Sequence, residues 1–192
     1  MARYGAQNDY GGHDLSIKER PTMIPAKVTT PQTPTPIDVG VFHAYSLPIG
    51  TGADEEWIKW VNTVPRRWDG ITNPYVSVLG ILDTAQTDAT DAFRLRLDWK
   101  NITPGDAFTT SANTVYFEQL TGVAAQYKSF VCTFAIDYDI DLANPLTALD
   151  SLGPKLWRVA KTTAGYTEVT GEIIIGGCTI TYRHDKLGAA WV

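Results

Sequence analysis

The chain has few of the residues that bind metals or act as nucleophiles. Only three histidines and two cysteines occur among its 192 residues. No HExxH motif, no histidine pair at ligand spacing and no Cys/His cluster indicates a zinc or iron centre, and no GxSxG motif marks a nucleophilic serine. The carboxylates Glu118, Glu168 and Glu172 stand alone, without the paired arrangement of a glycosidase. We therefore expect a protein that is not an enzyme and that carries no cofactor.

The chain also lacks long apolar runs and basic runs. No stretch approaches the roughly 18 apolar residues of a membrane helix, and the first residues lack the apolar segment of a secretion signal. The net charge is −5 and the isoelectric point is near 5.1, whereas phosphate contacts need a surplus of Lys and Arg. We expect synthesis in the cytoplasm and neither a membrane nor a nucleic-acid partner.

The two cysteines are too few for a disulfide scaffold and lack zinc-ligand spacing. Cys132 and Cys178 lie inside apolar strand patterns. We interpret them as small buried apolar residues, with a disulfide bridge or a reactive thiol as the alternatives.

Alternation of apolar and polar residues is the dominant pattern. In residues 92–100, AFRLRLDWK, the apolar Phe93, Leu95, Leu97 and Trp99 alternate with charged residues, which predicts a strand with one face in the core. Seven further segments are strand candidates: 39–47, 56–64, 75–82, 113–120, 130–139, 155–161 and 171–183. About eight antiparallel strands separated by turn residues predict an all-β, jelly-roll-like β-sandwich.

Two local features stand out within this pattern. Gly176 and Gly177 interrupt the last strand candidate, which predicts a bulge or a bend. In residues 144–153, NPLTALDSLG, Asn144 could cap a helix that begins at Pro145 and ends at Gly153. We expect one short helix there.

The N-terminal segment has a different composition. Residues 20–36 read RPTMIPAKVTTPQTPTP, which favours an extended chain. We divide the protein into an arm, 1–37, and a sandwich domain, 38–192. The arm is either a disordered leader or an element that lies across neighbouring subunits, and we favour the second. The interface candidates in the arm are Pro25, Pro31, Pro34 and Pro36.

A second interface candidate is the phrase VPRRWDG, which follows a predicted strand. Arg66 and Arg67 could pair with carboxylates of a neighbouring subunit, while Trp68 closes the end of the sandwich. We include all three residues among the interface candidates.

Two ligand sites are weaker candidates. Asp137, Asp139 and Asp141 alternate at the end of a strand and could hold Ca²⁺, although the EF-hand pattern fails at Leu142 and Ala148. A solvated strand end is the preferred interpretation. The tryptophans could stack on sugars, but Trp57, Trp60 and Trp157 lie where core residues are also expected. Their exposure distinguishes the two uses.

Taken in order, several phrases resemble a group of virus-associated proteins, the jelly-roll structural proteins of tailed viruses. These phrases are the turn at Pro65 to Gly70, the alternating strand Phe93 to Trp99, the FAIDYD strand Phe134 to Asp139, the LWRVA segment Leu156 to Ala160, and the last strand, Gly171 to Tyr182. The resemblance implies a jelly roll that assembles in a virion, and it brings no catalytic residues. The arm is not part of it.

The sequence therefore predicts a virion structural protein, most simply a decoration or capsid-associated protein. We expect it to form a homo-oligomer, by analogy a trimer, and to contact the major capsid protein or other virion proteins. The alternatives are a carbohydrate- or receptor-binding sandwich of a viral tail or spike and a small single-jelly-roll capsid protein. A jelly-roll hydrolase is a further possibility, which would need two carboxylates across a cleft and a strongly shifted pKa.

Overall fold

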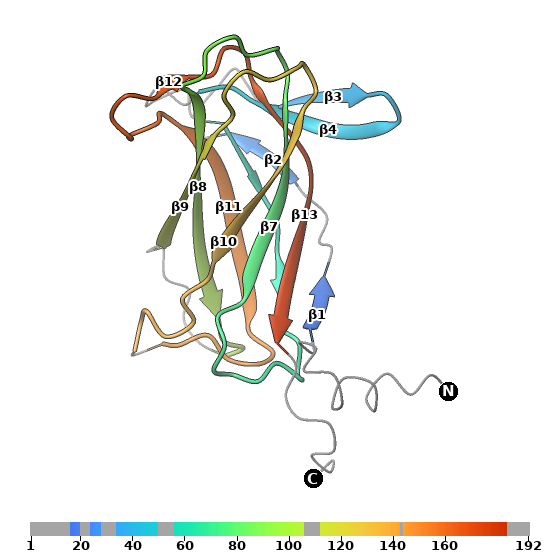
Figure 1. Cartoon of the computed structure of the whole chain (residues 1–192). Helices are drawn as coiled ribbons and strands as arrows, with labels where there is room; N and C mark the ends of the chain where they lie inside the picture. The colour runs from blue at the N-terminus through green and yellow to red at the C-terminus, as the bar shows by residue number, and fades with distance from the viewer. Residues whose placement is uncertain are drawn as a thin grey trace, which may run out of the picture.

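The computed structural model describes residues 16–19, 24–27, 34–49, 56–105, 112–142 and 144–183. Within these ranges the chain forms thirteen strands and no helix, and therefore no helix that could cross a membrane. The strands form two facing layers (Figure 1).

Each layer is a mostly antiparallel sheet. Sheet A has the order β10-β7-β13-β4-β3, with β1 beside β13. Its strands are β10 (Ser129–Ala135), β7 (Tyr75–Leu82), β13 (Ile173–Arg183), β4 (Phe42–Leu47), β3 (Thr35–Val39) and β1 (Ser16–Glu19). Sheet B has β9 beside β8, followed by β11, β5 and β2, while β6 pairs with β11 and β12 runs parallel to β8. Its strands are β9 (Asn113–Leu120), β8 (Asp91–Ile102), β11 (Ser151–Val159), β5 (Glu56–Lys59), β2 (Ile24–Lys27), β6 (Asn62–Thr63) and β12 (Thr167–Glu168).

The strand order is that of a jelly roll. If the eight principal strands (β4, β5, β7, β8, β9, β10, β11 and β13) are counted in chain order, sheet A reads first, eighth, third, sixth and sheet B reads second, seventh, fourth, fifth. Consecutive strands thus change sheet at every step except from the fourth to the fifth, β8 to β9, which are neighbours in sheet B. This is the order of the two Greek keys of a jelly roll. The predicted all-β sandwich is confirmed.

The core lies between the sheets and follows the alternation seen in the sequence. On β8, the side chains of Phe93, Leu95 and Leu97 are fully buried, and Trp99 is nearly so. Their partners come from the facing strands of sheet A. Each such side chain contributes about 1.5–3 kcal/mol through burial, so β8 stabilises the sandwich along its whole length.

The predicted bulge in the last strand is confirmed. The register of β13 against β7 shifts between Ile175 and Gly177. Before the shift Ile173 and Ile175 face the core, and after it Cys178 and Ile180 do. The extra residue therefore moves the inward-facing set from odd to even positions, which keeps both halves of the strand apolar on the core side.

The predicted helix over 144–153 is wrong. The buried carboxylate of Asp150 accepts hydrogen bonds from the amide of Thr147 (2.8 Å) and from Asn101 Nδ2 (3.0 Å), which fixes a turn. Leu149 has a φ of 73°, a left-handed value that no helix accepts. Strand β11 then starts at Ser151 and runs through Pro154. Tertiary contacts override the local helix signals here.

Pro154 is tolerated in a central strand because of where its nitrogen lies. Its carbonyl oxygen accepts a hydrogen bond from the amide of Trp60, at 3.2 Å. In a strand the nitrogen and carbonyl of one residue point to the same side. The nitrogen of Pro154 therefore faces the break between β5 and β6, where the ladder is interrupted.

The two cysteines are buried and free, as interpreted from the sequence. Cys132 on β10 and Cys178 on β13 both pair in register with Val78, one on each side of β7. Burial raises the pKa of each thiol to about 12. They act as apolar core residues.

The N-terminal segment contributes strands to both sheets. β1 pairs with the end of β13, and β2 pairs with β5 at the edge of sheet B (Figure 1). The expected boundary after residue 37 falls inside β3, which forms a hairpin with β4. The described parts of the segment are thus extended, but they pair with the chain's own sandwich instead of lying apart from it.

The β3–β4 hairpin has a two-residue turn, Gly40 and Val41, with Gly40 at a φ of 63°. This is the geometry of a type II′ turn, in which Val39 and Phe42 share backbone hydrogen bonds. Counting back, the backbone groups of Asp38 and Pro36 point away from β4, toward the side of β3 with which no described strand pairs. Pro36 thus removes a donor from the edge of sheet A, which protects it against pairing with another chain.

We therefore expect Pro36→Val to promote edge-to-edge association, because it restores an N–H at the open edge. Light scattering after size-exclusion chromatography should show a mass that rises with concentration more steeply than in the parent protein. Thr35→Val is the matched control, since the amide of Thr35 already faces Ser46 on β4. Equal behaviour of the two variants would contradict this role of Pro36.

Candidate functional site

The outer face of sheet B gathers charged and aromatic side chains. The strand registers place Tyr116 of β9 opposite Arg96 of β8, Arg96 opposite Trp157 of β11, and Trp157 opposite Trp57 of β5. These four residues point away from the core, because their neighbours along each strand point into it. We call them the aromatic row, which crosses four strands.

Cations lie on the aromatic rings of this face. The indole rings of Trp57 and Trp157 have centroids 4.8 Å apart. Lys155 Nζ lies 4.1 Å from the ring centroid of Trp157 and 4.8 Å from that of Trp57. The guanidinium of Arg96 lies 5.5 Å from the ring centroid of Trp157. Such contacts order the long basic side chains over the sheet.

A parallel contact lies at the other end of the row. The guanidinium carbon of Arg94 is 3.9 Å from the ring centroid of Tyr116, and Arg94 Nε is 3.8 Å from Glu118 Oε2. Tyr116 remains 48% exposed. A ligand that crosses the sheet can therefore contact this ring.

Acidic side chains fix the basic ones in place. Arg96 Nε donates to Asp98 Oδ1 at 2.8 Å, and this oxygen also accepts from Thr114 Oγ1 at 2.7 Å. Lys100 Nζ lies 3.6 Å from Asp141 Oδ2. On the outer face of β5, β8, β9 and β11, with Asp141 at its border, basic side chains still outnumber acidic ones: Lys59, Arg94, Arg96, Lys100 and Lys155 against Asp98, Glu118 and Asp141. An acidic protein thus has one face with a surplus of positive charge.

Glu118 joins this face to the loop after β11. Its carboxylate accepts hydrogen bonds from the amides of Thr162 and Thr163, each at 3.0 Å, and from Thr162 Oγ1. Burial raises the pKa of Glu118, but these hydrogen bonds outweigh it and lower the pKa to about 2. The group is therefore held as a carboxylate, the opposite of what a general acid requires.

The outer face of sheet A has the opposite character. In the orientation of Figure 1, the upper end of the sandwich is the end at β12 and the lower end is the end at β1. Between these ends, the outward side chains of sheet A are small or uncharged: Val131, Thr133 and Ala135 of β10, Tyr75, Ser77 and Leu79 of β7, and Gly177, Thr179 and Thr181 of β13. Ser77 and Thr133 share a hydrogen bond across the strands. The two outer faces of the sandwich are thus chemically distinct.

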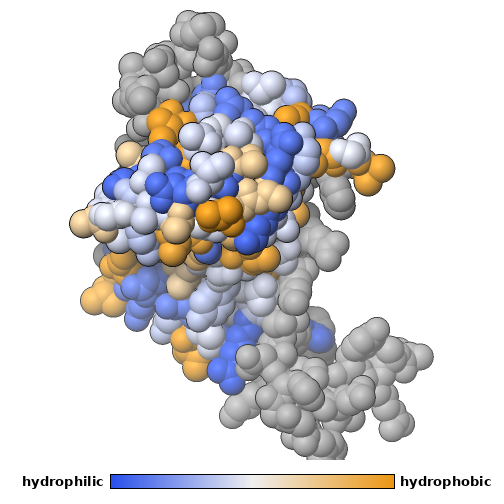
Figure 2. Space-filling view, turned by 45° about the horizontal axis from the view of Figure 1, so that its top comes forward, coloured by the Kyte–Doolittle hydropathy of each residue, from blue (hydrophilic) through white to orange (hydrophobic). Residues whose placement is uncertain are grey.

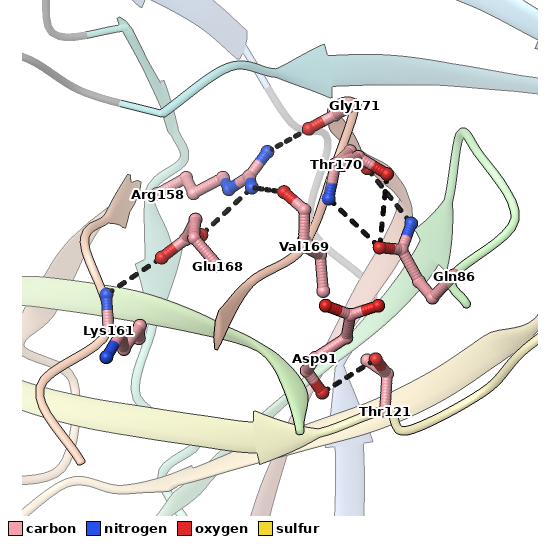
Figure 3. Close-up of polar contacts among 9 residues, drawn as sticks. All are labelled: Gln86, Asp91, Thr121, Arg158, Lys161, Glu168, Val169, Thr170 and Gly171. Atoms are coloured by element: carbon pink, nitrogen blue, oxygen red, sulfur yellow. Dashed lines mark hydrogen bonds and ion pairs between the residues drawn. The ribbon is translucent and has the colours of Figure 1, made fainter. Parts of the chain in front are cut away.

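A buried polar cluster lies beside β12, at the upper end of the sandwich in Figure 1, and Figure 3 shows its contacts. Arg158, 2% exposed, donates from Nη1 to the carbonyl of Gly171 (2.6 Å) and from Nη2 to Glu168 Oε1 (3.0 Å) and the carbonyl of Val169 (3.1 Å). Glu168 Oε2 accepts from the amide of Lys161. Burial lowers the pKa of Arg158, while Glu168 raises it. The cluster is therefore a structural ion pair in which both terminal nitrogens of Arg158 have acceptors. Its Nε is buried and has no hydrogen-bond partner among the described residues.

Gln86 extends the cluster to the next loop. Its side chain accepts from the amide of Thr170 (2.9 Å) and donates to the carbonyl oxygens of Thr84 (2.7 Å) and Thr170 (3.0 Å). Nearby, Thr121 Oγ1 donates to the carbonyl oxygen of Asp91 (Figure 3). Three loops are thereby tied together at this end.

Exposed apolar side chains are scattered over both loops and strands, for example Val123 in a loop and Val131 on β10. Figure 2, which brings the upper end forward, shows apolar surface in separate patches between polar ones. Val123, 68% exposed, lies in the loop after β9 at this end. Dispersed apolar residues of this kind are ordinary on a soluble surface.

The predicted interface residues after β6 separate into two groups. Arg66 and Arg67 are exposed. Trp68 is only 3% exposed: its ring contacts Tyr138 and Tyr182, and its Nε1 donates to the carbonyl of Thr72 at 2.9 Å. The prediction that Trp68 closes the end of the sandwich agrees with the structure, but this burial removes it from the interface candidates.

The prolines of the N-terminal segment also differ from one another. Pro25 lies in β2 opposite Ile58, and Pro31 lies outside the described residues. Pro34 is buried and Pro36 is exposed on the edge strand. Of these, Pro36 is placed where it would meet a neighbouring chain, and there it discourages strand pairing.

The predicted calcium ligands do not come together. Asp137 and Asp139 are close enough that a hydrogen bond and charge repulsion from Asp139 raise the pKa of Asp137, whereas Asp141 lies beside Lys100. Across the part of the chain that is described, no group of three acidic, histidine or cysteine side chains is placed to hold a metal ion.

The tryptophans that would indicate sugar stacking are mostly covered. Trp60 is in the core at 1% exposure, and Trp157 is on the outer face but only 5% exposed. Trp57 is half-buried. Stacking of a neutral sugar on exposed tryptophans therefore loses its main support.

Two groups of residues were not predicted from the sequence. Arg158 lies on the inward side of β11, two residues after the inward-facing Leu156. The available signal in the sequence was a charged residue at an inward position of the segment LWRV. The aromatic row joins residues from four strands far apart in the sequence, so it becomes visible only when the registers are known.

No protein-family model and no curated protein sequence matches the chain. Among solved structures, the chain is similar to the enzymatically active domain of tailspike protein 4 of bacteriophage CBA120, with 8% identity and a TM-score of 0.37 over 95% of this chain and 21% of that one. It is also similar to CBM28, a carbohydrate-binding module specific for non-crystalline cellulose (15% identity, TM-score 0.31, 81% and 80% covered), and to Eiger TNF from S. frugiperda (13%, 0.34, 93% and 98%). None of these likenesses indicates a function.

We expect Arg158→Met to lower the free energy of unfolding by about 3 kcal/mol, because it leaves Glu168 and two carbonyl oxygens without their donor in a buried site. Urea unfolding monitored by tryptophan fluorescence measures the change. Arg183→Met is the matched control: Arg183 is largely exposed and 3.9 Å from Asp69, so its loss should cost less than about 1 kcal/mol. Similar costs for the two variants would contradict the structural role of the cluster.

We also expect Glu118→Gln to change the acid limb of stability. Because the pKa of Glu118 is about 2 in the folded protein, below its ordinary value, the carboxylate stabilises the fold above about pH 4.5, and this contribution is lost as the pH falls toward 2. The variant should be less stable than the parent at pH 7 and equal to it near pH 2, as measured by thermal unfolding across this range.

Asp137→Asn serves as the control, because the pKa of Asp137 is shifted in the opposite direction to that of Glu118. The pKa of Asp137 is raised by Asp139, so removing the charge should not destabilise the protein at pH 7. A destabilisation of Glu118→Gln that is the same at pH 7 and pH 2 would contradict the hydrogen-bond explanation.

Proposed function

We propose that the protein is a non-enzymatic structural component of a virion. In this proposal it attaches to the capsid shell as a decoration or capsid-associated protein, and it contacts both the major capsid protein and further copies of itself, which by analogy form a trimer. The resemblance of residues from about 38 to about 188 to jelly-roll structural proteins of tailed viruses supports the proposal, and so does the jelly-roll strand order.

The observation that carries the proposal is the placement of β1 and β2. These two short strands extend both sheets of the sandwich, and they are held by backbone ladders to β13 and β5. Backbone ladders are independent of side-chain identity, so the same strand can pair with the same sheet in a neighbouring copy. Exchange of this kind joins subunits without the loss of any contact.

The placement of β1 and β2 also changes the expectation from the sequence. An arm that reaches only to a neighbour would leave one side of the end of β13 and one side of β5 without a partner in its own domain, whereas β1 and β2 occupy these positions. The proposal therefore takes the form of strand exchange between equivalent positions. Arg66 and Arg67, exposed at the lower end of the sandwich, remain candidate contacts with an acidic partner surface.

A disulfide between β1 and β13 tests this exchange. Lys18 and Thr181 are Cα partners in the ladder, and paired residues of antiparallel strands lie within disulfide reach. We expect Lys18→Cys/Thr181→Cys to form covalent oligomers on oxidation, seen on a non-reducing denaturing gel. The buried Cys132 and Cys178 should not react.

The two single cysteine variants show how much covalent dimer forms by random collision. The double variant could instead be oligomeric in solution but run as a monomer on the denaturing gel. That result would contradict strand exchange and would mean that the subunits assemble through other contacts. A parent protein that stays monomeric at all concentrations would contradict assembly of the protein by itself.

A further inference from the structure

We propose that the outer face of sheet B binds an anionic glycan, that is, a sugar chain carrying carboxylate or sulfate groups. This inference is independent of the proposed virion role. It is based on the aromatic row and on the basic side chains around it.

The first step is the shape of the face. The aromatic row crosses paired strands from Tyr116 on β9 to Trp57 on β5. Since neighbouring strands lie about 4.8 Å apart, the row spans about 14 Å. Its two ends are accessible: Tyr116 is 48% exposed and Trp57 is half-buried. An extended chain laid across the strands would meet a ring at each end.

The second step is what lies between these rings. The ring of Trp157 is covered by Lys155 and flanked by Arg96, so a ligand there meets ammonium and guanidinium groups and not an indole face. The indole N–H of Trp157 is buried and has no acceptor among the described residues. A ligand oxygen that displaces Lys155 would satisfy this donor. The centre of the row is thus suited to acidic groups.

At the ends of the row, Arg94 and Lys155 each lie on one side of a ring, 3.9 Å from the centroid of Tyr116 and 4.8 Å from that of Trp57. The exposed part of each end ring is left for the apolar face of a sugar.

The third step is charge. The protein carries a net charge of −5, yet the outer face of sheet B has five basic side chains and only three acidic ones. Attraction of an anionic chain to this face therefore works against the repulsion of the rest of the molecule, which orients the ligand on sheet B. A neutral glycan gains nothing from this arrangement.

The fourth step separates a glycan from other anionic chains. An acidic peptide binds most readily by pairing with a sheet edge, and the row is centred on β8 and β11, whose edges are already paired. Nucleic acid would need a larger basic surplus than a protein of this charge offers. A flat face with rings at both ends and cations between them is most compatible with a chain of acidic sugars.

Binding is measured by isothermal titration with four probes: heparin as a sulfated glycan, polygalacturonate as a carboxylated one, dextran as a neutral one and poly-glutamate as an acidic peptide. We expect one or both anionic glycans to bind, with an affinity that falls as salt is raised. Dextran and poly-glutamate should bind at least about tenfold more weakly.

Two variants locate the site. Lys155→Gln should weaken binding of the anionic glycan by about tenfold or more, since it removes a charge-assisted contact at the centre of the row. Tyr116→Ala removes the exposed ring at one end and should weaken binding without changing its salt dependence. Lys128→Gln is the matched control, because Lys128 carries the same charge on the loop before β10 and should leave binding unchanged.

The proposal is overturned if neither anionic glycan binds, if dextran binds equally well, or if Lys128→Gln weakens binding as much as Lys155→Gln. Equal binding of poly-glutamate would mean that the face binds any acidic chain, and this result also overturns the proposal of a glycan site. The virion role is unaffected by each of these outcomes, since it is tested by the disulfide between β1 and β13.

Discussion

The antiparallel pairing of β8 with β11 is the constraint on which the rest of the structure depends. It runs from Ser151 opposite Ile102 to Val159 opposite Arg94. A slip of one residue would turn the buried Leu95 and Leu97 to solvent and would bring Arg96 into the core. The same register that closes the core also sets Arg96 beside Trp157 on the outside. Core and outer face are therefore two consequences of one alignment.

Arg158 shows how far this constraint reaches. Arg158 lies two residues after Leu156 on β11, so both side chains are on the same, inward face. The register therefore turns the charged side chain of Arg158 toward the core at the upper end. The fold accommodates it because β12 supplies the carboxylate of Glu168 and the loop after β12 supplies the carbonyl oxygens of Val169 and Gly171. A buried ion pair of this kind adds little net stability but is costly to break. It therefore specifies how the loops close the sandwich.

The sequence was sufficient for the features that depend on alternation alone. It placed β7 and β9 with the observed bounds, and the glycines at 176 and 177 indicated the bulge. It failed over 144–153, because the local helix signals there are outweighed by the contacts of Asp150 with Asn101. It could not reveal the aromatic row, because cross-strand neighbours follow from register and not from spacing along the chain. Trp68 was correctly placed at the end of the sandwich, yet its burial could not be separated from an interface role without the rings of Tyr138 and Tyr182.

The two proposals meet at β5. Its inner neighbour is β11 and its outer neighbour is β2, so Trp57, the last member of the aromatic row, has Ala26 as its Cα partner on the other side. If β2 is exchanged between copies, the backbone beside Trp57 belongs to a neighbouring subunit, and the edge of the glycan face is completed only in the assembly. Assembly would then bring several basic faces together, and weak contacts of each with one anionic chain would add up through effective concentration. In these two proposals, the exchange of a short strand would give a protein with a modest binding face a physical reason to act as an oligomer.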